Sequence, residues 1–428
     1  MKKRILSVLV TLSMVLALLP GTAMAAYEDR TQVIRIYNAD GKTTRKLQDG
    51  QYLADNEEST VPADYNEGDS YVIYYADNTL TLNGYNGGMI EVGAPKGETL
   101  TVELVGDNTI TATQSGQSSK TSQSYRSPLV GLSTSSRGKI QSTSGFPFHD
   151  GVNPLVVGGS GSLSINLDGS GESNSENNAS VNAYGLAGNR VTITDEANVT
   201  IYVIVDSSKM DNPVAKGIYA GYGVTVDSEG KLDVTAEVKD DEGRTGRAWG
   251  IHTAAGMVSL SGGDKIVQAL HTGEQHDNRF TWGIVSEGWW TYDRKTMPTS
   301  GWVQVKDCSL TINSSTYGIV ARQSTLTDDS TRESYTTLYP EGGRIVFDNA
   351  TVTMGTSEKG GLTFGKVIGL HTEGGYHGNN EPDIIIQNST LTIGDEGTTG
   401  DYTYDRGIYS ENNGILIQDS QVDIYANT

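Results

Sequence analysis

The stretch that decides the fold is residues 217–234, which read Gly-Ile-Tyr-Ala-Gly-Tyr-Gly-Val-Thr-Val-Asp-Ser-Glu-Gly-Lys-Leu-Asp-Val. It contains three short apolar alternations that are separated by tight Gly and Asp turns. A glycine followed by Ile or Leu begins the same cadence at Gly131, Gly185, Gly217, Gly250, Gly283, Gly318, Gly369 and Gly407. The central separations are 32, 33, 33 and 35 residues. A fixed period of this size is typical of a solenoid.

Each repeat reads as a Gly-apolar start followed by two apolar-x-apolar segments, with a turn before each. One repeat has Gly185-Leu186, then Val191 and Ile193, then Val199 and Ile201. Alternate side chains of a strand point to opposite faces, so three strands per coil would stack Val, Ile and Leu in inward columns. We therefore predict an all-β chain that folds as a right-handed, three-sided parallel β-helix. A propeller is the alternative, but its blades need about 40 residues and four strands.

The N-terminal residues have the features of a secretory signal peptide. Three cations at residues 2–4 precede an apolar run over residues 5–19, and Ala23-Met24-Ala25 follows as a small-residue cleavage site. This pattern predicts a signal peptide over residues 1–25 and an extracellular, secreted or cell-surface protein. A membrane anchor is the alternative, but the chain has no second apolar run of spanning length. We therefore expect no membrane contact after cleavage.

Both ends of a solenoid need cover. The repeat is absent from residues 26–78, where strand-like stretches at 33–36 and 71–75 flank an acidic middle. We predict that residues 26–78 form an N-terminal β cap and that residues 79–428 form the parallel β-helix. The last strand ends near Thr428 without a polar cap, and an open edge invites aggregation. We expect either a continuation beyond this residue, such as a C-terminal domain, or a partner that covers the end.

Composition narrows the possible partners. With 31 basic and 52 acidic residues the formal net charge is −21, and removal of the three signal-peptide cations leaves −24. A phosphate surface demands the opposite sign, so no nucleic acid is expected. The single cysteine, Cys308, cannot form an intramolecular disulfide, so stability must come from the fold itself. Fifty-two glycines and many β-branched residues are typical of short strands joined by tight turns.

Three segments of the repeat resemble a known group of proteins: Thr79-Leu80-Thr81-Leu82-Asn83-Gly84-Tyr85, Gly106-Asp107-Asn108-Thr109-Ile110-Thr111 and Arg406-Gly407-Ile408-Tyr409. With them the chain resembles the secreted β-helix proteins of Gram-positive anaerobes that are labelled carbohydrate-binding domain-containing. It is also similar in architecture to the pectin-lyase-like superfamily. The resemblance covers the chain from about residue 79 and lies in repeat cadence, with no active-site signature. It implies an extracellular, surface-associated role.

The sequence lacks the signatures of related enzymes. The β-helix polygalacturonases use grouped aspartates with Gly-His-Gly and Arg-Ile-Lys segments, and neither segment is present. A lyase would need a base such as Arg or Lys and usually calcium. Acidic turns such as residues 239–243 could bind calcium, but they match no loop with defined ligand spacing, so a solvated turn is favoured. We expect no catalytic residue, no metal site and no cofactor, with calcium as the open possibility.

A row of Asp and Asn residues aligns at one turn of successive coils. Its members each precede a small residue, and they are Asp307, Asn349, Asn388 and Asp419. Because Asn and Asp tolerate left-handed backbone and bond to nearby amides, the row predicts a structural ladder at a corner of the β-helix. Cys308 takes the small-residue place at this turn and needs no catalytic role.

All five tryptophans fall between residues 249 and 302. Trp249, Trp282 and Tyr317 each directly precede the Gly of successive coils, so they should stack as a ladder. Strand alternation gives them the inward parity of Ile251, which favours a buried corner ladder over a sugar-binding platform.

The remaining aromatics suggest a binding surface. They lie in inserted loops or have outward parity, and residues 279–344 carry seven basic and seven acidic side chains, which makes this region neutral within an acidic protein. Flat apolar faces beside neutral polar groups are suited to stacking on pyranose rings. The predicted carbohydrate-binding residues are Trp289, Trp290, Tyr292, Trp302, Tyr335 and Tyr339. The alternative is that these aromatics only fold their loops onto the flank of the β-helix.

The histidines give a weaker signal. His252 and His371 share an outward row that also contains valines, so we interpret them as surface histidines, with metal binding as the alternative.

The sequence as a whole favours a secreted, non-catalytic β-helix protein that binds an extracellular glycan or a surface protein. The alternatives are a polysaccharide lyase or glycoside hydrolase, and a structural stalk or adhesin module. An enzyme would bring two acids, or an acid with Arg or Lys, together within about 5 to 10 Å.

Overall fold

The computed structural model describes residues 33–39, 43–93, 98–113, 128–134, 153–170, 182–206, 213–240, 246–273, 280–288, 301–314, 316–322, 343–355, 367–373, 381–394, 404–411 and 413–425. Every regular element in these ranges is a β-strand, which confirms the predicted all-β class. Within the same ranges there is no helix long and apolar enough to cross a membrane. The predicted signal peptide lies outside the described residues.

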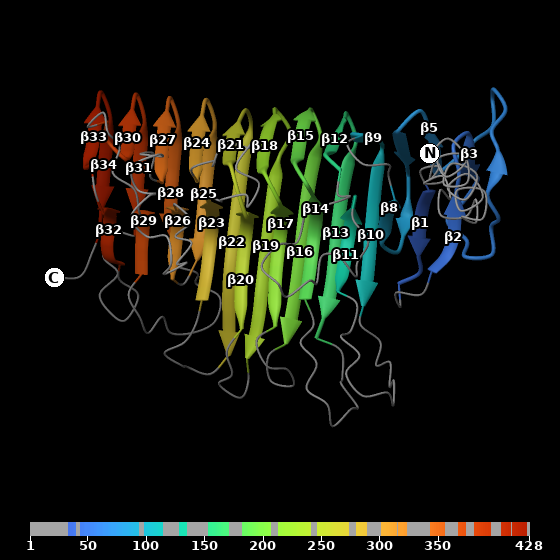
Figure 1. Ribbon diagram of the computed structural model, residues 1–428, viewed down its shortest axis with the longest axis horizontal. Helices are drawn as coiled ribbons and strands as arrows, with labels where there is room; N and C mark the ends of the chain where they lie inside the picture. The colour runs from blue at the N-terminus through green and yellow to red at the C-terminus, as the bar shows by residue number, and fades with distance from the viewer. Residues whose placement is uncertain are drawn as a thin grey trace, which may run out of the picture.

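The strands form three sheets that run side by side along the long axis of the molecule (Figure 1). Sheet A has the order β2 (Thr43–Leu47), β1 (Val33–Tyr37), β8 (Ile90–Gly93), β11 (Leu129–Ser133), β14 (Asn182–Gly188), β17 (Val214–Ala220), β20 (Arg247–Thr253), β23 (Phe280–Glu287), β26 (Tyr317–Arg322), β29 (Val367–Glu373) and β32 (Tyr404–Ser410). Sheet B has the order β4 (Ala63–Asp64), β3 (Gln51–Leu53), β5 (Ile73–Ala76), β6 (Thr79–Asn83), β9 (Leu100–Val105), β12 (Leu155–Gly159), β15 (Val191–Asp195), β18 (Gly223–Ser228), β21 (Met257–Ser261), β24 (Trp302–Lys306), β27 (Arg344–Asp348), β30 (Ile384–Gln387) and β33 (Ile415–Gln418). Sheet C has the order β7 (Asn86–Gly87), β10 (Asp107–Thr113), β13 (Ser162–Gly169), β16 (Asn198–Asp206), β19 (Leu232–Asp240), β22 (Asp264–Gly273), β25 (Ser309–Ser314), β28 (Thr351–Gly355), β31 (Thr390–Ile393) and β34 (Gln421–Ile424).

Successive coils lie on one another in parallel register. Ile218 pairs with Ile251, Ile251 with Ile284, and Ile284 with Ile319, each one residue after the repeated glycine. These side chains and their counterparts in sheets B and C are fully buried in one continuous core. The predicted parallel β-helix, with one strand of each coil in each of three sheets, is therefore confirmed. Its right-handedness stays a prediction.

The strands at the N-terminal end pair differently. Strand β1 is antiparallel to both β2 and β8, and β5 is antiparallel to β3 and β6. At the other end, Ile415 and Ile417 of β33 are 44% and 48% exposed. The function of residues 26–78 as a cap and the cover over the last coil stay predictions.

The repeated glycine of sheet A faces the interior. A Cβ on Gly250 would lie 2.3 Å from Cγ1 of the core residue Val267 and 2.7 Å from the carbonyl oxygen of Gly283. Gly250 and Ile251 thus occupy two successive inward positions, which shifts the alternation by one residue. Trp249 consequently points outward, where it packs with a separate apolar cluster. The predicted inward parity of the Trp249 row was wrong because strict alternation does not hold across this glycine.

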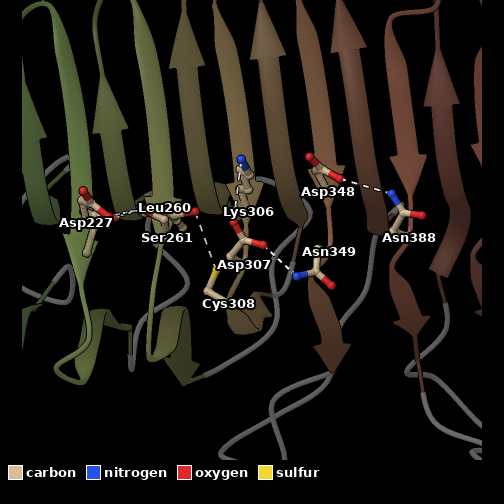
Figure 2. Close-up of polar contacts among 10 residues, drawn as sticks. Asp227, Leu260, Ser261, Lys306, Asp307, Cys308, Asp348, Asn349 and Asn388 are labelled. Carbon is tan, nitrogen blue, oxygen red and sulfur yellow. Dashed lines mark hydrogen bonds and ion pairs between the residues drawn. The ribbon is translucent and has the colours of Figure 1, made fainter.

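The turn between sheets B and C repeats with the same backbone geometry in most coils. Asp307, Asn349, Asn388 and Asp419 have φ values of 51°, 52°, 50° and 49°, which is the left-handed region. Asn349 Nδ2 donates a hydrogen bond of 2.7 Å to Asp307 Oδ1 of the preceding coil (Figure 2). The predicted structural ladder is confirmed. Cys308 is partly buried beside it, with Sγ 3.7 Å from the Leu260 carbonyl oxygen.

One core column contains a charged residue. Lys265 pairs with Leu232 on one side and Leu310 on the other, and its side chain is only 1% exposed. Its Nζ donates to the carbonyl oxygens of Ser228 and Gly230 at 2.8 and 3.1 Å. Buried polar groups need such partners because an unpaired one costs the full desolvation free energy. Lys265 therefore ties one coil to the turn of the coil before it.

Candidate functional site on the outer face of sheet A

Sheet A is flanked by the connections that vary in length. Between sheets B and C, every connection contains one to three residues. The connections that enter or leave sheet A reach 21 residues, as between Ser133 and Leu155 and between Arg322 and Arg344. Loops on a rigid scaffold are where binding and catalytic residues concentrate. The connections therefore favour the outer face of sheet A as the candidate functional site.

An aromatic ladder runs along this face. Its rings come from seven successive strands and stack at centroid distances of 4.8 to 6.2 Å. In order along the axis they are Tyr184, Tyr219, His252, Trp249, Trp282, Tyr317, His371 and Tyr409. The closest pair, Trp249 and Trp282, is stacked with an interplanar angle of 9°. The outward shift at the glycine explains the ladder, because it places the residue before the glycine beside the residue two positions after it.

The ladder stabilises the fold more than it offers a sugar platform. Trp249 and Trp282 are 8% and 7% exposed, and each has another ring stacked on it. A pyranose stacks on an aromatic face, and these faces already contact each other. Trp249, Trp282 and Tyr317 stack as the predicted ladder, in which the two tryptophans are buried and Tyr317 is partly buried, and the ladder lies outside the main core.

A strip of ion pairs borders the ladder at the end of sheet A. Arg322 Nη1 lies 3.9 Å from Glu287 Oε1, and Arg322 Nε lies 3.1 Å from Glu373 Oε2. His252 Nε2 approaches Glu287 Oε1 at 3.6 Å. On the next coils, the two ring nitrogens of His371 lie 3.3 Å from Glu373 Oε1 and 3.7 Å from Glu411 Oε1.

The two histidines are buried, so their interpretation as surface residues was wrong. His252 and His371 are 7% and 6% exposed because the rings of the ladder enclose them. Burial, and then the neighbouring Lys216, lower the pKa of His252 to about 4. Burial also lowers the pKa of His371, against the pull of Glu373 and Glu411. Both imidazoles are therefore neutral at pH 7.

Glu287 is the ionised partner in this strip. Burial would raise its pKa, but the neighbouring His252, which is protonated in the acid range where Glu287 titrates, and the guanidinium of Arg322 lower it to about 2. A carboxyl group that donates a proton to a glycosidic oxygen needs a raised pKa. Glu287, whose pKa is lowered, is instead ionised at neutral pH and cannot donate that proton.

Lys216 occupies one rung of the ladder. Its Nζ lies 3.7 Å from the ring centroid of Tyr219, 4.8 Å from that of Trp249 and 5.8 Å from that of Tyr184. The residue is 7% exposed, and burial lowers the pKa of its amine to about 7. The ring faces compensate part of the lost hydration through cation–π attraction.

Trp302 lies next to the ion-pair strip, where the chain passes from sheet A to sheet B. Gly288 N and Gly301 N both donate to the carbonyl oxygen of Arg322, at 2.7 and 3.2 Å, so the connection of residues 289–300 starts and ends at one point. Trp302 has the predicted outward parity on β24, and its indole is half-buried. The guanidinium of Arg344 lies 5.3 Å from its ring centroid.

Several donors at this corner are buried and unpaired among the residues that the structure describes. They are Trp302 Nε1, Arg322 Nε and Arg344 Nε, which make no hydrogen bond of good geometry. Arg322 Nε is close to Glu373, but the bond is poorly aligned. Native structures contain few such groups, and each calls for an explanation such as a ligand or an ordered water. We define the corner site as Trp302, Arg322 and Arg344.

Of the predicted carbohydrate-binding residues, only Trp302 is in the described part of the chain. Trp289, Trp290, Tyr292, Tyr335 and Tyr339 lie outside the described residues, as does most of the acidic turn at 239–243. Sequence reasoning missed the ion-pair strip. Glu287, Arg322, Glu373 and Glu411 all stand four residues after a repeated glycine, and this shared position was the signal that could have found them.

The described residues contain no cluster of three or more His, Cys, Asp or Glu side chains placed to hold a metal ion. Comparison of the chain with protein-family models, with curated proteins and with solved structures finds no match.

Proposed function

We propose that this protein is a secreted, surface-associated β-helix protein that binds a neutral carbohydrate at the corner site. The observation that carries the proposal is the half-buried indole of Trp302, whose Nε1–H is unpaired in the described structure, beside the guanidinium of Arg344, whose Nε is also unpaired. A sugar hydroxyl accepts from such donors, and the indole face suits the apolar face of a pyranose.

Charge supports a neutral ligand. Arg322 is neutralised by Glu287 and Glu373, and Arg344 Nη1 pairs with Glu381 Oε2 at 3.0 Å. Carboxylates therefore match both guanidinium charges of the corner site, which disfavours an anionic ligand. The predicted aromatics at residues 289–292 belong to the connection whose flanking residues, Gly288 and Gly301, both donate to the Arg322 carbonyl oxygen, which is consistent with a role in the same site.

The test is a glycan array with the mature protein, followed by calorimetry on the best ligand. Trp302→Ala should raise Kd about tenfold or more, since it removes a stacking face and a hydrogen-bond donor. Tyr202→Ala is the matched control, because Tyr202 is an aromatic residue 37% exposed on sheet C. Equal binding by wild type and Trp302→Ala would refute the corner site. Weaker binding by Trp289→Ala/Trp290→Ala would extend the site to the connection.

A second candidate function is a polysaccharide lyase or hydrolase, and the ion-pair strip is what favours it. Glu287, Arg322 and Glu373 meet within the distance that an enzyme would require. Two features oppose it: the charges are paired with one another, and the pKa of Glu287 is lowered. Incubation with the glycan that binds, followed by chromatography of the products, separates the two. Turnover that Glu287→Gln abolishes would establish the enzyme.

A further inference from the structure

A second aromatic cluster lies on sheet B, on the antiparallel strands at the N-terminal end and the segments that connect them. It consists of Tyr52, Tyr65, Tyr71 and Tyr74, which we call the tyrosine platform. Tyr65 is central: its ring centroid is 4.5 Å from that of Tyr74 and 5.9 Å from those of Tyr52 and Tyr71. All four residues are only half-buried. The corner site and the aromatic ladder use none of them.

The backbone fixes the platform on the outer face of the sheet. Tyr52 and Tyr74 are direct partners across β3 and β5, and the alternate residues Leu53 and Ile73 are fully buried in the core. Tyr65 is held beside them by a hydrogen bond of 2.9 Å from its N–H to the Gly50 carbonyl oxygen. The rings thus form a preorganised surface, which lowers the ordering cost of binding.

The segment that carries the platform is itself acidic, and Arg45, whose Nη1 donates to the Glu57 carbonyl oxygen at 2.7 Å, is a cation beside it. Residues 49–77 contain eight acidic side chains and no Lys, Arg or His. Asp64 accepts a bond from Gln51, and Asp69 accepts the N–H of Asn66, so two of the carboxylates are fixed by neutral donors within the platform strands and turn. No described salt bridge involves a carboxylate of this segment. The same segment carries Val61, which is 77% exposed.

We infer that the tyrosine platform is a docking surface for an arginine-rich segment of a partner protein. A guanidinium is planar and weakly hydrated, so it can stack on a tyrosine ring while its N–H groups pair with a carboxylate. The platform supplies both groups side by side, and the unbalanced negative charge steers a cationic partner toward it. A neutral glycan would use the rings but would gain nothing from the eight carboxylates. This inference is independent of the corner site.

The test is the affinity of the full mature chain for a fluorescent oligo-arginine peptide at physiological salt. Tyr65→Ala/Tyr74→Ala should raise Kd about tenfold, because two cation–π contacts are lost. Tyr65→Phe/Tyr74→Phe keeps the ring faces and should bind within about twofold of wild type. Oligo-lysine of the same length should bind more weakly, since an ammonium cannot stack and pair at once.

Two further measurements keep the result from being a general charge effect. Asp233→Asn/Asp423→Asn removes two carboxylates from sheet C and should leave Kd within about twofold. Thermal unfolding of each variant shows that the β-helix is intact. The inference is overturned if the alanine variant binds like wild type, if the sheet C control loses as much affinity, or if a neutral glycan competes for the platform.

Discussion

The corner between sheets B and C and the strand of sheet A require different residues for different physical reasons. The corner between sheets B and C is short in every coil and needs a residue that accepts a left-handed backbone, such as Asn349. The strand of sheet A needs a glycine for space, since any side chain at Gly250 would enter the core. The first demand concerns a dihedral angle and the second concerns volume. The length of the connection differs from coil to coil where neither demand applies, which is at the ends of the sheet A strands.

The largest expected effect tests the demand for space. Gly250→Ala should lower the free energy of unfolding by about 3 kcal/mol, the upper end for overpacking, because its Cβ would meet Val267 and the Gly283 carbonyl. Gly84→Ala is the control at a B–C corner: φ is 71° and no atom lies within 4 Å, so the cost should be only about 1 kcal/mol. Urea unfolding measures both. Equal costs would remove the distinction between the B–C corner and the strand of sheet A.

The next effect concerns the buried amine of the ladder. The pKa of Lys216 is about 7 in the fold and has its ordinary, higher value in the unfolded chain, so the unfolded chain binds more protons between these values. Relative to Lys216→Met, wild type should therefore gain stability as pH rises above 7, by up to about 1.4 kcal/mol per pH unit. Unfolding titrations at several pH values measure the slope. A flat difference would show that the amine stays charged and solvated.

A smaller effect tests the demand on the dihedral angle. Asn349→Ala should cost about 1 kcal/mol, because φ of 52° is unfavourable for alanine and the bond to Asp307 is lost. Asn349→Gly should cost less than Asn349→Ala, since glycine adopts this angle freely. Differential scanning calorimetry of Asn349→Ala and Asn349→Gly compares the two losses of stability. If glycine is the worse substitution, the side-chain bond matters more than the backbone angle.

The smallest effect is expected at the same corner. Burial raises the pKa of the Cys308 thiol to about 11, so thiolate is scarce at pH 8 and alkylation should be far slower than for a free thiol. Cys308→Ala should change stability by less than about 1 kcal/mol, since alanine fits the same small place, as Ala350 does in the next coil. Iodoacetamide labelling followed by mass spectrometry measures the alkylation rate, and urea unfolding measures the change in stability. Rapid labelling in the folded protein would contradict the structural role.

The sequence predicted the features that depend on one residue at a time. The Gly-Ile period identified the coils, and the conformational tolerance of Asn and Asp identified the B–C corner. The orientation of Trp249 could not be predicted by alternation, because the inward glycine adds a position that no side chain marks. The ion pairs of Arg322 join three coils, and their partners are 35 and 51 residues away in sequence. Such contacts become visible only when the coils are placed in register.

Lys265 has a consequence for how the coils find their order. A stack of similar coils could slide by one repeat and still match Leu or Val with Leu or Val at most positions of the column. A displaced Lys265 would lose both carbonyl acceptors and bury a bare ammonium against apolar neighbours, which is strongly unfavourable. Lys265, like the buried Asn108 near the other end of the same column, thus distinguishes its coil from the coils with Leu or Val at this position. Lys265 thus helps to fix which coil lies on which.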